Sequence, residues 1–272
     1  MFREFIKSIY YFLYQFFFSD FLILSFFPLK KILIINKKKK NYFFQFIRDK
    51  NDLNTFRQIF IKEEYNFKNE INKLIYVNYL KIINNNKIPL IVDCGANICA
   101  SSNYFNIIFP SSTVVAIEPD EINSKLFNKN NINKDKVKLI KCAISSENFY
   151  YDTIRKDNDG RSSYIKEKIN AGPYDENLNK TITIPEILKK HKKSIYEPLL
   201  VKIDIEGHEK KLFQSNTKWI KLFKYLIIEL HDWMIPDENI SSEFKKVVSK
   251  QLSKYDVYTF GENTLVINRS KS

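Results

Sequence analysis

From residue 90 onward, short and almost continuously apolar runs alternate with longer segments in which apolar side chains recur at helical spacing. The apolar runs are 90–92, 113–117, 137–144, 199–205 and 225–230. Strands that are apolar on both faces are typical of a parallel sheet covered by helices on both sides. We therefore expect residues 90–272 to form one doubly wound α/β domain.

The C-terminal end of the chain breaks this parallel pattern. Residues 255–260 and 264–268 have the character of strands, and only the turn Gly261–Asn263 separates them. Two strands joined by so short a turn form an antiparallel hairpin. We expect a mostly parallel sheet that ends in one antiparallel hairpin strand. The polar stretch 150–180 interrupts the alternation and lies either on the ligand side of the sheet or at its periphery.

Two segments precede the expected α/β domain. Residues 1–50 are hydrophobic and basic, with ten Lys or Arg against three acidic residues, in a chain whose net charge is +13. Residues 51–89 form a helical N-terminal extension, with helices expected at 52–64 and 67–85. A basic surplus favours anionic partners such as a membrane surface, nucleic acid or a phosphorylated glycan.

Between Lys7 and Lys30 lie 22 residues dominated by Phe, Tyr, Ile and Leu, a length sufficient to cross a bilayer. Asp20, near the middle, would cost roughly 2.5–3.5 kcal/mol at bilayer depth. Aromatic rings followed by the lysine run 37–40 favour the membrane interface instead. We expect residues 1–40 to contain a helix that contacts a membrane surface or a partner, and a helix packed on the catalytic domain is the alternative.

The cysteines indicate the cellular compartment of the protein. Cys94, Cys99 and Cys142 form no CxxC pair and are too few for a disulfide framework. Free thiols inside apolar runs are typical of a reducing cytosol. Together with the N-terminal segment, they predict a cytoplasmic protein that is peripheral on the inner face of the membrane.

The first candidate site follows the first two strands, because ligands bind beyond the carboxyl ends of strands in doubly wound sheets. Gly95 allows a tight turn and close approach of a ligand, and Asn97 can add a side-chain hydrogen bond. The helix that begins near Ala100 can receive a carboxylate on its first amides. Glu118, 23 positions past Gly95, stands where an acidic side chain binds the hydroxyls of a ribose. The expected cofactor-binding residues are Asp93, Gly95, Asn97, Glu118 and Ala143.

The glycine pattern separates two kinds of nucleotide cofactor. A dinucleotide needs the sequence G-x-G-x-x-G around its pyrophosphate. Gly95, Asn97 and Ala100 occupy the corresponding positions, so the pattern fails at its second glycine. This argues against a dehydrogenase and favours a cofactor without pyrophosphate, such as S-adenosylmethionine.

A second candidate site follows the fourth and fifth strands. Asp204 and Glu206 share one face by strand alternation, as do Glu229 and His231. We expect Asp204, Glu206 and His231 to be catalytic, with His231 suited by its ordinary pKa to act as a base. Either acid could orient His231, bind the acceptor hydroxyl or hold a divalent cation. No sequence pattern fixes a coordination set, so we expect no metal site and keep a cation as the less favoured alternative.

With these motifs, the chain resembles the FkbM-type methyltransferase family. The resembling segments are 92–98, 116–119, 160–163, 201–209 and 228–231, in the family's order. The resemblance implies a Rossmann-like methyltransferase sheet, S-adenosylmethionine as cofactor, and O-methylation of a hydroxyl on a saccharide, polyketide or other small acceptor. Cys99 departs from the family, which usually has a second glycine there, and this implies a tighter cofactor loop or weaker binding.

Two alternative functions stay open. One is a membrane-associated binding protein with an inactive methyltransferase fold, which the basic aromatic N-terminus and Cys99 would suit. The other is a different nucleotide-dependent Rossmann-like enzyme, which the missing glycine pattern argues against. Nucleic acid is a disfavoured partner, because Lys and Arg do not alternate with aromatic residues around the expected site. Trp233 could stack on a sugar or belong to the core, and the sequence specifies neither the acceptor nor the oligomeric state.

Overall fold

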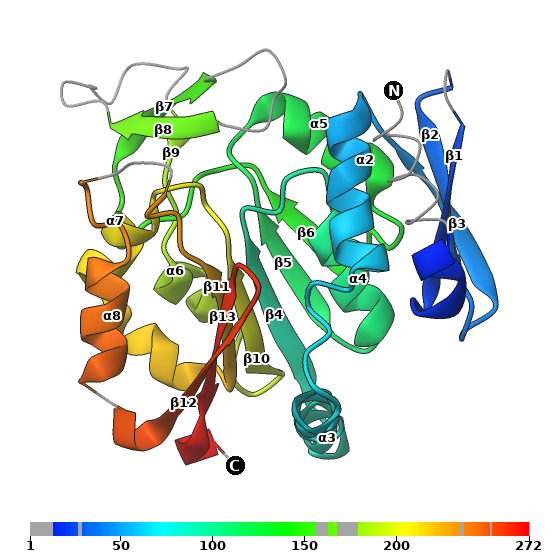
Figure 1. Ribbon diagram of the computed structural model, residues 1–272. Helices are drawn as coiled ribbons and strands as arrows, with labels where there is room; N and C mark the ends of the chain where they lie inside the picture. Colours follow the sequence, from blue (N-terminus) through cyan, green and yellow to red (C-terminus); the bar gives the residue numbers. More distant parts are fainter. Residues whose placement is uncertain are drawn as a thin grey trace.

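The computed structural model describes residues 13–26, 29–155, 163–167, 179–233, 237–250 and 252–271. Its centre is one large sheet, whose strands are β4 (Ile88–Cys94), β5 (Thr113–Ile117), β6 (Val137–Ile140), β10 (Tyr196–Ile203), β11 (Tyr225–Glu229), β12 (Tyr255–Phe260) and β13 (Asn263–Asn268). These seven strands lie in the order β12-β13-β11-β10-β4-β5-β6 (Figure 1). β13 runs antiparallel to β11 and β12, and the other neighbouring pairs are parallel. The expected mostly parallel sheet with an antiparallel hairpin strand is confirmed.

The strand order reverses beside β4. After β6 the chain returns across the sheet and enters β10 on the other side of β4. Parallel pairing places Asp93 beside Lys202 and Cys94 beside Ile203. The loops that follow β4 and β10 therefore leave the sheet next to each other, at the point where a doubly wound fold forms its ligand crevice.

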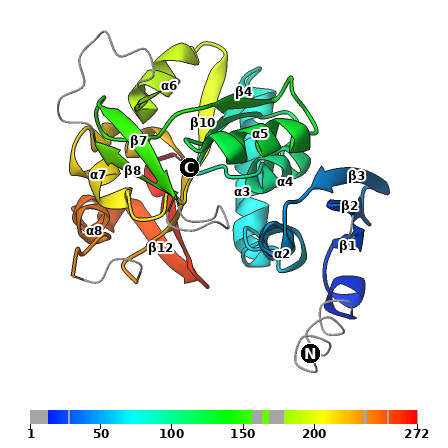
Figure 2. The ribbon, with the colours of Figure 1, turned by 90° about the horizontal axis from the view of Figure 1, so that it is seen from above.

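Helices cover both faces of the sheet (Figure 2). Successive strand residues point to opposite faces, so Ile91 belongs to one buried cluster and Val92 to the other. The first cluster is covered by α2 (Lys50–Phe56), the π-helical turn η1 (Arg57–Ile61), α3 (Asn69–Asn84), α4 (Ala100–Ile108) and α5 (Glu121–Asn130). The second is covered by α6 (Ile184–Lys190), α7 (Glu209–Gln214), the 3-10 turn η2 (Thr217–Leu222) and α8 (Ser242–Ser249). Helices and the turn η1 therefore occupy most of residues 51–89.

The N-terminal segment differs from the expected membrane-surface helix. Of the described residues among 1–49, only 13–17 are helical, and an antiparallel sheet follows with strands β1 (Phe21–Phe26), β2 (Lys31–Asn36) and β3 (Asn41–Phe46). The physical reason is that burial alternates along β1 and β2, and the inward residues pack against η1 and α4. The lysine run 37–40 forms the turn between β2 and β3. Residues 1–12 lie outside the described part of the chain.

Buried polar contacts fasten the N-terminal sheet to the catalytic domain. Gln45 on β3 is fully buried and donates to the carbonyl of Asn130 at 3.0 Å. Asn103 donates to the side chain of Gln45 at 3.2 Å, and Asn130 donates to the carbonyl of Phe46 at 3.1 Å. Asp20, which argued against a membrane span, pairs with Lys38 at 2.6 Å. Among the described helices, none has the length and apolar character that crossing a bilayer requires.

The polar insertion forms a small antiparallel sheet of β7 (Tyr150–Arg155), β8 (Ser163–Glu167) and β9 (Asn179–Lys180). Lys211, in α7, pairs with Glu167 and lies 4.0 Å above the ring of Phe149. These contacts hold the insertion to the chain that follows β10, on the ligand side of the large sheet. β6 is shorter than expected, because the residues after Ile140 leave the sheet and Ile144 bridges to Ile182.

Candidate active site

A cavity of about 350 Å³ opens where β4, β10 and β11 end, at the strand reversal. One wall is the loop after β4 together with the start of α4. The opposite wall carries the charged side chains that follow β10 and β11, and residues of α2, η1 and the following turn form a third wall. Of the predicted site residues, those that line the cavity are Gly95, Asn97, Asp204, Glu206 and His231.

Gly95 is required by the packing of two strand ends. Its φ is +78°, and a Cβ at this position would lie 1.7 Å from the carbonyl oxygen of Asp204. From the sequence we expected the missing Cβ to permit close approach of a ligand, whereas the closest neighbour in the structure is the backbone after β10. Glycine thus brings the β4 loop against Asp204, and so joins the two predicted halves of the site.

A buried ion network lies beneath this loop. Asp93 is fully buried and accepts hydrogen bonds from Ser101 at 2.7 Å and from Ser102 at 2.6 Å. Lys202 Nζ lies 3.3 Å from Asp93 and 3.4 Å from Asp204, and it donates to the carbonyl of Gly95 at 2.8 Å. Burial lowers the pKa of Lys202, but the charges of Asp93 and Asp204 outweigh it and raise the pKa, so Lys202 is charged. Asp93 therefore anchors the start of α4 and does not line the cavity.

Glu118 lies behind the β4 loop and does not line the cavity. It is buried, and its carboxylate accepts hydrogen bonds from the backbone N–H groups of Asn97 and Asp120, both at 2.9 Å. Burial raises its pKa to about 7, although these donors oppose the rise. Ala143, the remaining predicted cofactor residue, is buried beyond the end of β6.

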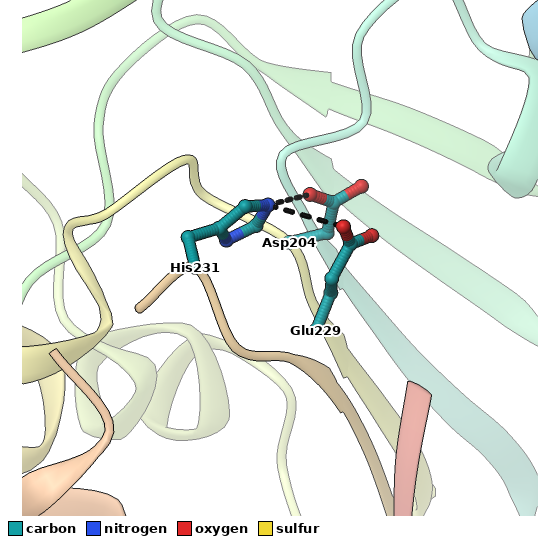
Figure 3. A group of neighbouring side chains, drawn as sticks. All are labelled: Asp204, Glu229 and His231. Atoms are coloured by element: carbon teal, nitrogen blue, oxygen red, sulfur yellow. Dashed lines mark ion pairs between the residues drawn. The ribbon is translucent and has the colours of Figure 1, made fainter. Parts of the chain in front are cut away.

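The catalytic candidates Asp204 and His231 lie side by side, together with Glu229 (Figure 3). His231 Nε2 lies 3.6 Å from Asp204 Oδ1 and 3.4 Å from Glu229 Oε1. On the other side of the ring, Nδ1 is hydrogen-bonded at 2.8 Å to Glu209, which is fully buried. Two carboxylates thus face one imidazole nitrogen, and a third holds the other.

This environment changes the acid–base character expected for His231. Burial on its own lowers the pKa of His231, but the carboxylates of Glu209, Glu229 and Asp204 outweigh it and raise the pKa to about 10. The site therefore holds His231 protonated at neutral pH. The ordinary histidine pKa assumed from the sequence does not apply, because it ignored neighbours from two other segments of the chain.

Several functional candidates were missed or left undecided by the sequence. Lys202 and Glu209 flank Asp204 in the acidic stretch but had no assigned role. Glu64 lines the cavity from the turn after η1, and no local signal places it there. Trp233 is 71% exposed at the cavity, so it is not a core residue. Residues 160–162 of the predicted motif 160–163 lie outside the described residues.

The sheet order and the cavity at its reversal define a Rossmann-like methyltransferase. Residues 93–256 match the family described as the methyltransferase FkbM domain. The chain belongs to the FkbM methyltransferase family, and the suspected resemblance is confirmed.

Three solved structures with a similar fold are distant in sequence from this chain. A candidate caffeoyl-CoA O-methyltransferase of Staphylococcus aureus is 14% identical, with 79% of this chain and 99% of that chain covered and a TM-score of 0.40. Precorrin-6y C5,15-methyltransferase of Geobacter metallireducens is 13% identical, with 74% and 88% covered and a TM-score of 0.34. The N-terminal domain of human METTL16, in complex with SAH, is 13% identical, with 67% and 62% covered and a TM-score of 0.36. No curated protein matches the chain. These similarities concern the fold alone.

Proposed function

We propose that this protein uses S-adenosylmethionine to methylate a hydroxyl group of an uncharged saccharide. One observation carries the proposal. A single cavity joins the β4 loop and the start of α4, which suit the cofactor, to Asp204, Glu206 and His231, which suit the acceptor. An acceptor held by the second group would lie within reach of a methyl group presented by the first.

The residues present fit this cofactor. Asn97 lines the cavity. Its Oδ1 atom is buried and has no hydrogen-bond partner within the described part of the protein. It can accept from the amino group of the cofactor. Ala100 and Ser101, the first residues of α4, line the cavity, and the first amides of a helix can receive the carboxylate of the cofactor. The acidic wall suits the positive charge of its sulfonium group. Glu118 accepts from the backbone N–H of Asn97 and so supports the loop that we propose holds the cofactor.

When bound, the cofactor supplies a methyl group that is already activated on a positively charged sulfur. The protein must align the acceptor oxygen and remove its proton. Asp204 suits this task, since its side chain is 33% exposed and lines the cavity, as does Glu206. His231 uses Nδ1 for Glu209 and directs Nε2 toward Asp204 and Glu229. It is therefore placed to orient these carboxylates.

The charge of the cavity bears on the acceptor. Five acidic side chains line it (Glu64, Asp204, Glu206, Glu229 and Glu262), against the cations Lys202 and His231. An anionic acceptor would be repelled, so we set aside the phosphorylated glycans that the net charge of the chain suggested. The exposed ring of Trp233 offers a flat apolar surface on which a sugar can stack. A neutral saccharide satisfies both features.

The test begins with calorimetric titration of S-adenosylmethionine and continues with transfer of a labelled methyl group to matched neutral and phosphorylated saccharides. We expect transfer to neutral acceptors. We also expect Asp204→Asn to lose about 10²–10⁴-fold in rate, with cofactor affinity retained. Full activity in Asp204→Asn would refute the assigned role, and a protein that binds no cofactor would favour the inactive-fold alternative.

We also propose that the N-terminal sheet contacts an anionic membrane. Cross-strand pairing places Leu24, Leu33 and Phe44 on its outer face, and Leu22, Ile35 and Tyr42 beside them. Tyr42 is 69% exposed and Phe44 is 52% exposed. The lysine turn 37–40 adjoins this face, and an apolar surface edged by lysines complements anionic lipid.

Surface substitutions are the right test of membrane contact, because deletion of the sheet would open the core that it shares with α4. We expect Tyr42→Ser combined with Phe44→Ser to reduce sedimentation with anionic liposomes at low salt. Leu74→Ser, at an exposed apolar position on α3, is the matched control. Equal sedimentation of the double variant and the control would contradict the proposal.

A further inference from the structure

Asp204, Glu229 and His231 bring three potential metal-ligand atoms together at the end of β10 and at the end of β11. One carboxylate oxygen from each acid and one imidazole nitrogen all lie within 4.8 Å of one another (Figure 3). Asp204 and Glu229 are partly exposed, whereas His231 is 3% exposed. The open side of the cluster is the cavity, which all three residues line.

The separations around His231 Nε2 suit a shared cation better than direct hydrogen bonds. Nitrogen–oxygen hydrogen bonds have lengths of about 2.7–3.2 Å, and the separations here are 3.6 Å to Asp204 and 3.4 Å to Glu229. Nitrogen and oxygen ligands lie about 2.0–2.2 Å from a zinc ion. Tetrahedral ligands at those distances are separated from one another by roughly 3.3–3.6 Å. The two observed separations fall in this range.

Glu209 supplies an independent feature of a metal site. A histidine that ligates a metal usually donates its other ring N–H to a carboxylate, which fixes the tautomer and the ring orientation. Glu209 is fully buried and lies 2.8 Å from His231 Nδ1, and it also accepts from the backbone N–H of Ile205 at 3.3 Å. This arrangement directs the Nε2 lone pair of a neutral His231 toward Asp204 and Glu229.

A second acidic group, Glu64, Glu229 and Glu262, lies in the same cavity. It contains no histidine, and Glu64 already accepts hydrogen bonds from Gln58 at 3.1 Å and Asn263 at 2.9 Å. This second group therefore lacks the histidine that distinguishes the first group, and it serves as a comparison for the first group.

We propose that Asp204, Glu229 and His231 bind a divalent transition-metal ion that holds the hydroxyl oxygen of the acceptor. Mixed imidazole and carboxylate ligands suit Mn²⁺ or Zn²⁺, and three protein ligands leave a position for the acceptor. The proposal rests on the methyltransferase function proposed above and adds a cation that the sequence did not favour.

The cation lowers the pKa of the hydroxyl that it binds. It also makes Asp204 a ligand, so Glu206 takes over the removal of the proton. The acceptor O–H bond breaks and its proton passes to the carboxylate of Glu206, which lines the cavity outside the proposed ligand set. The new oxygen–carbon bond forms as the carbon–sulfur bond of the cofactor breaks, and that electron pair stays on sulfur. His231 ligates in its neutral form, so binding of the cation releases any proton held on Nε2.

The test is calorimetric titration of the full-length, EDTA-treated protein with Mn²⁺. We expect one Mn²⁺ per chain, with affinity at least about tenfold weaker in each of Asp204→Asn, Glu229→Gln and His231→Gln. Glu209→Gln should weaken binding about 10–100-fold through the orientation of His231. Glu262→Gln, the matched control in the neighbouring acidic group, should bind Mn²⁺ as the wild type does. Thermal unfolding of each variant checks that it is folded.

Two results would overturn the cation site. One is Mn²⁺ affinity that is unchanged in folded Asp204→Asn and Glu229→Gln. The other is loss of binding in Glu262→Gln to the same extent as in Asp204→Asn. Titration of S-adenosylmethionine in EDTA separates this proposal from the one it rests on. Retained cofactor binding without an Mn²⁺ site overturns the cation alone, whereas absent cofactor binding overturns the methyltransferase function.

Discussion

Cofactor binding should depend on pH through Glu118, whose pKa burial raises to about 7. Only the ionised carboxylate can accept from the backbone N–H groups of Asn97 and Asp120 without donating a proton in return, so the β4 loop should keep the shape proposed for cofactor binding only while Glu118 is ionised. When a ligand binds only one form of a protein, its apparent dissociation constant equals the intrinsic dissociation constant divided by the fraction of protein in that form. With a pKa of about 7, the ionised fraction falls from about 0.9 at pH 8 to about 0.1 at pH 6. The affinity for S-adenosylmethionine should therefore fall about tenfold.

The assay is calorimetric titration of the wild type and of Glu118→Gln from pH 6 to pH 8. The amino group of the cofactor also titrates in this range. Its effect is the same for both proteins, so it cancels in the ratio of the Glu118→Gln dissociation constant to that of the wild type at each pH. We expect Glu118→Gln to bind at least about tenfold more weakly than the wild type at pH 8, and the ratio to shrink toward 1 at pH 6. A ratio that does not change with pH would refute the role of Glu118.

Stability gives a second readout that needs no cofactor. Folding raises the pKa of Glu118 from 4.5 to about 7 because burial disfavours the charged form. Its contribution to stability is complete below pH 4.5 and is lost as the pH rises through 7, a change of roughly 3 kcal/mol. Glu118→Gln cannot titrate. Its unfolding free energy, measured relative to the wild type, should therefore rise by about that amount between pH 4.5 and pH 8.

Three further predictions concern the site. Gly95→Ala should lose at least about 2 kcal/mol of unfolding free energy, because its Cβ would meet Asp204 at 1.7 Å from a left-handed backbone; a wild-type melting temperature would contradict this. Lys202→Met should cost about 3–5 kcal/mol in denaturant unfolding, because Asp93 would be left as a buried charge; a loss below 1 kcal/mol would show that the network is dispensable. Trp233→Ala should raise the KM for a saccharide acceptor about threefold to tenfold without changing cofactor affinity, and an unchanged KM would remove the stacking role.

Cys99 shows how a departure visible in the sequence acquires a physical meaning only in the structure. The resemblance to the family marked this position as one that usually holds glycine. In the structure, Cys99 has φ +80° directly before α4, and its side chain is fully buried. A left-handed conformation costs a residue with a Cβ roughly 1–2 kcal/mol. The departure from the family pattern therefore appears as backbone strain between the β4 loop and α4.

The N-terminal segment shows where local pattern was insufficient. Its apolar and aromatic character suggested a helix at a membrane surface, and no periodicity within residues 8–29 argued otherwise. The register of β1 against β2, and of β2 against β3, determines which side chains face the core and which face outward. That register depends on packing against η1 and α4, which are distant in the sequence.

The sequence by itself determined the large sheet, its hairpin strand and the family, because strands that are apolar on both faces are stable only when helices cover both. It also determined which strand end carries Gly95 and Asn97 and which strand ends carry the acidic residues, since these follow directly from the chain order. The tertiary structure decided what those residues do. Neighbouring carboxylates raise the pKa of His231, Asp93 is internal, and the cavity is acidic in a chain of net charge +13. The physical reason is that pKa, burial and local charge depend on neighbours such as Glu64, Glu209 and Glu229, which only folding brings together.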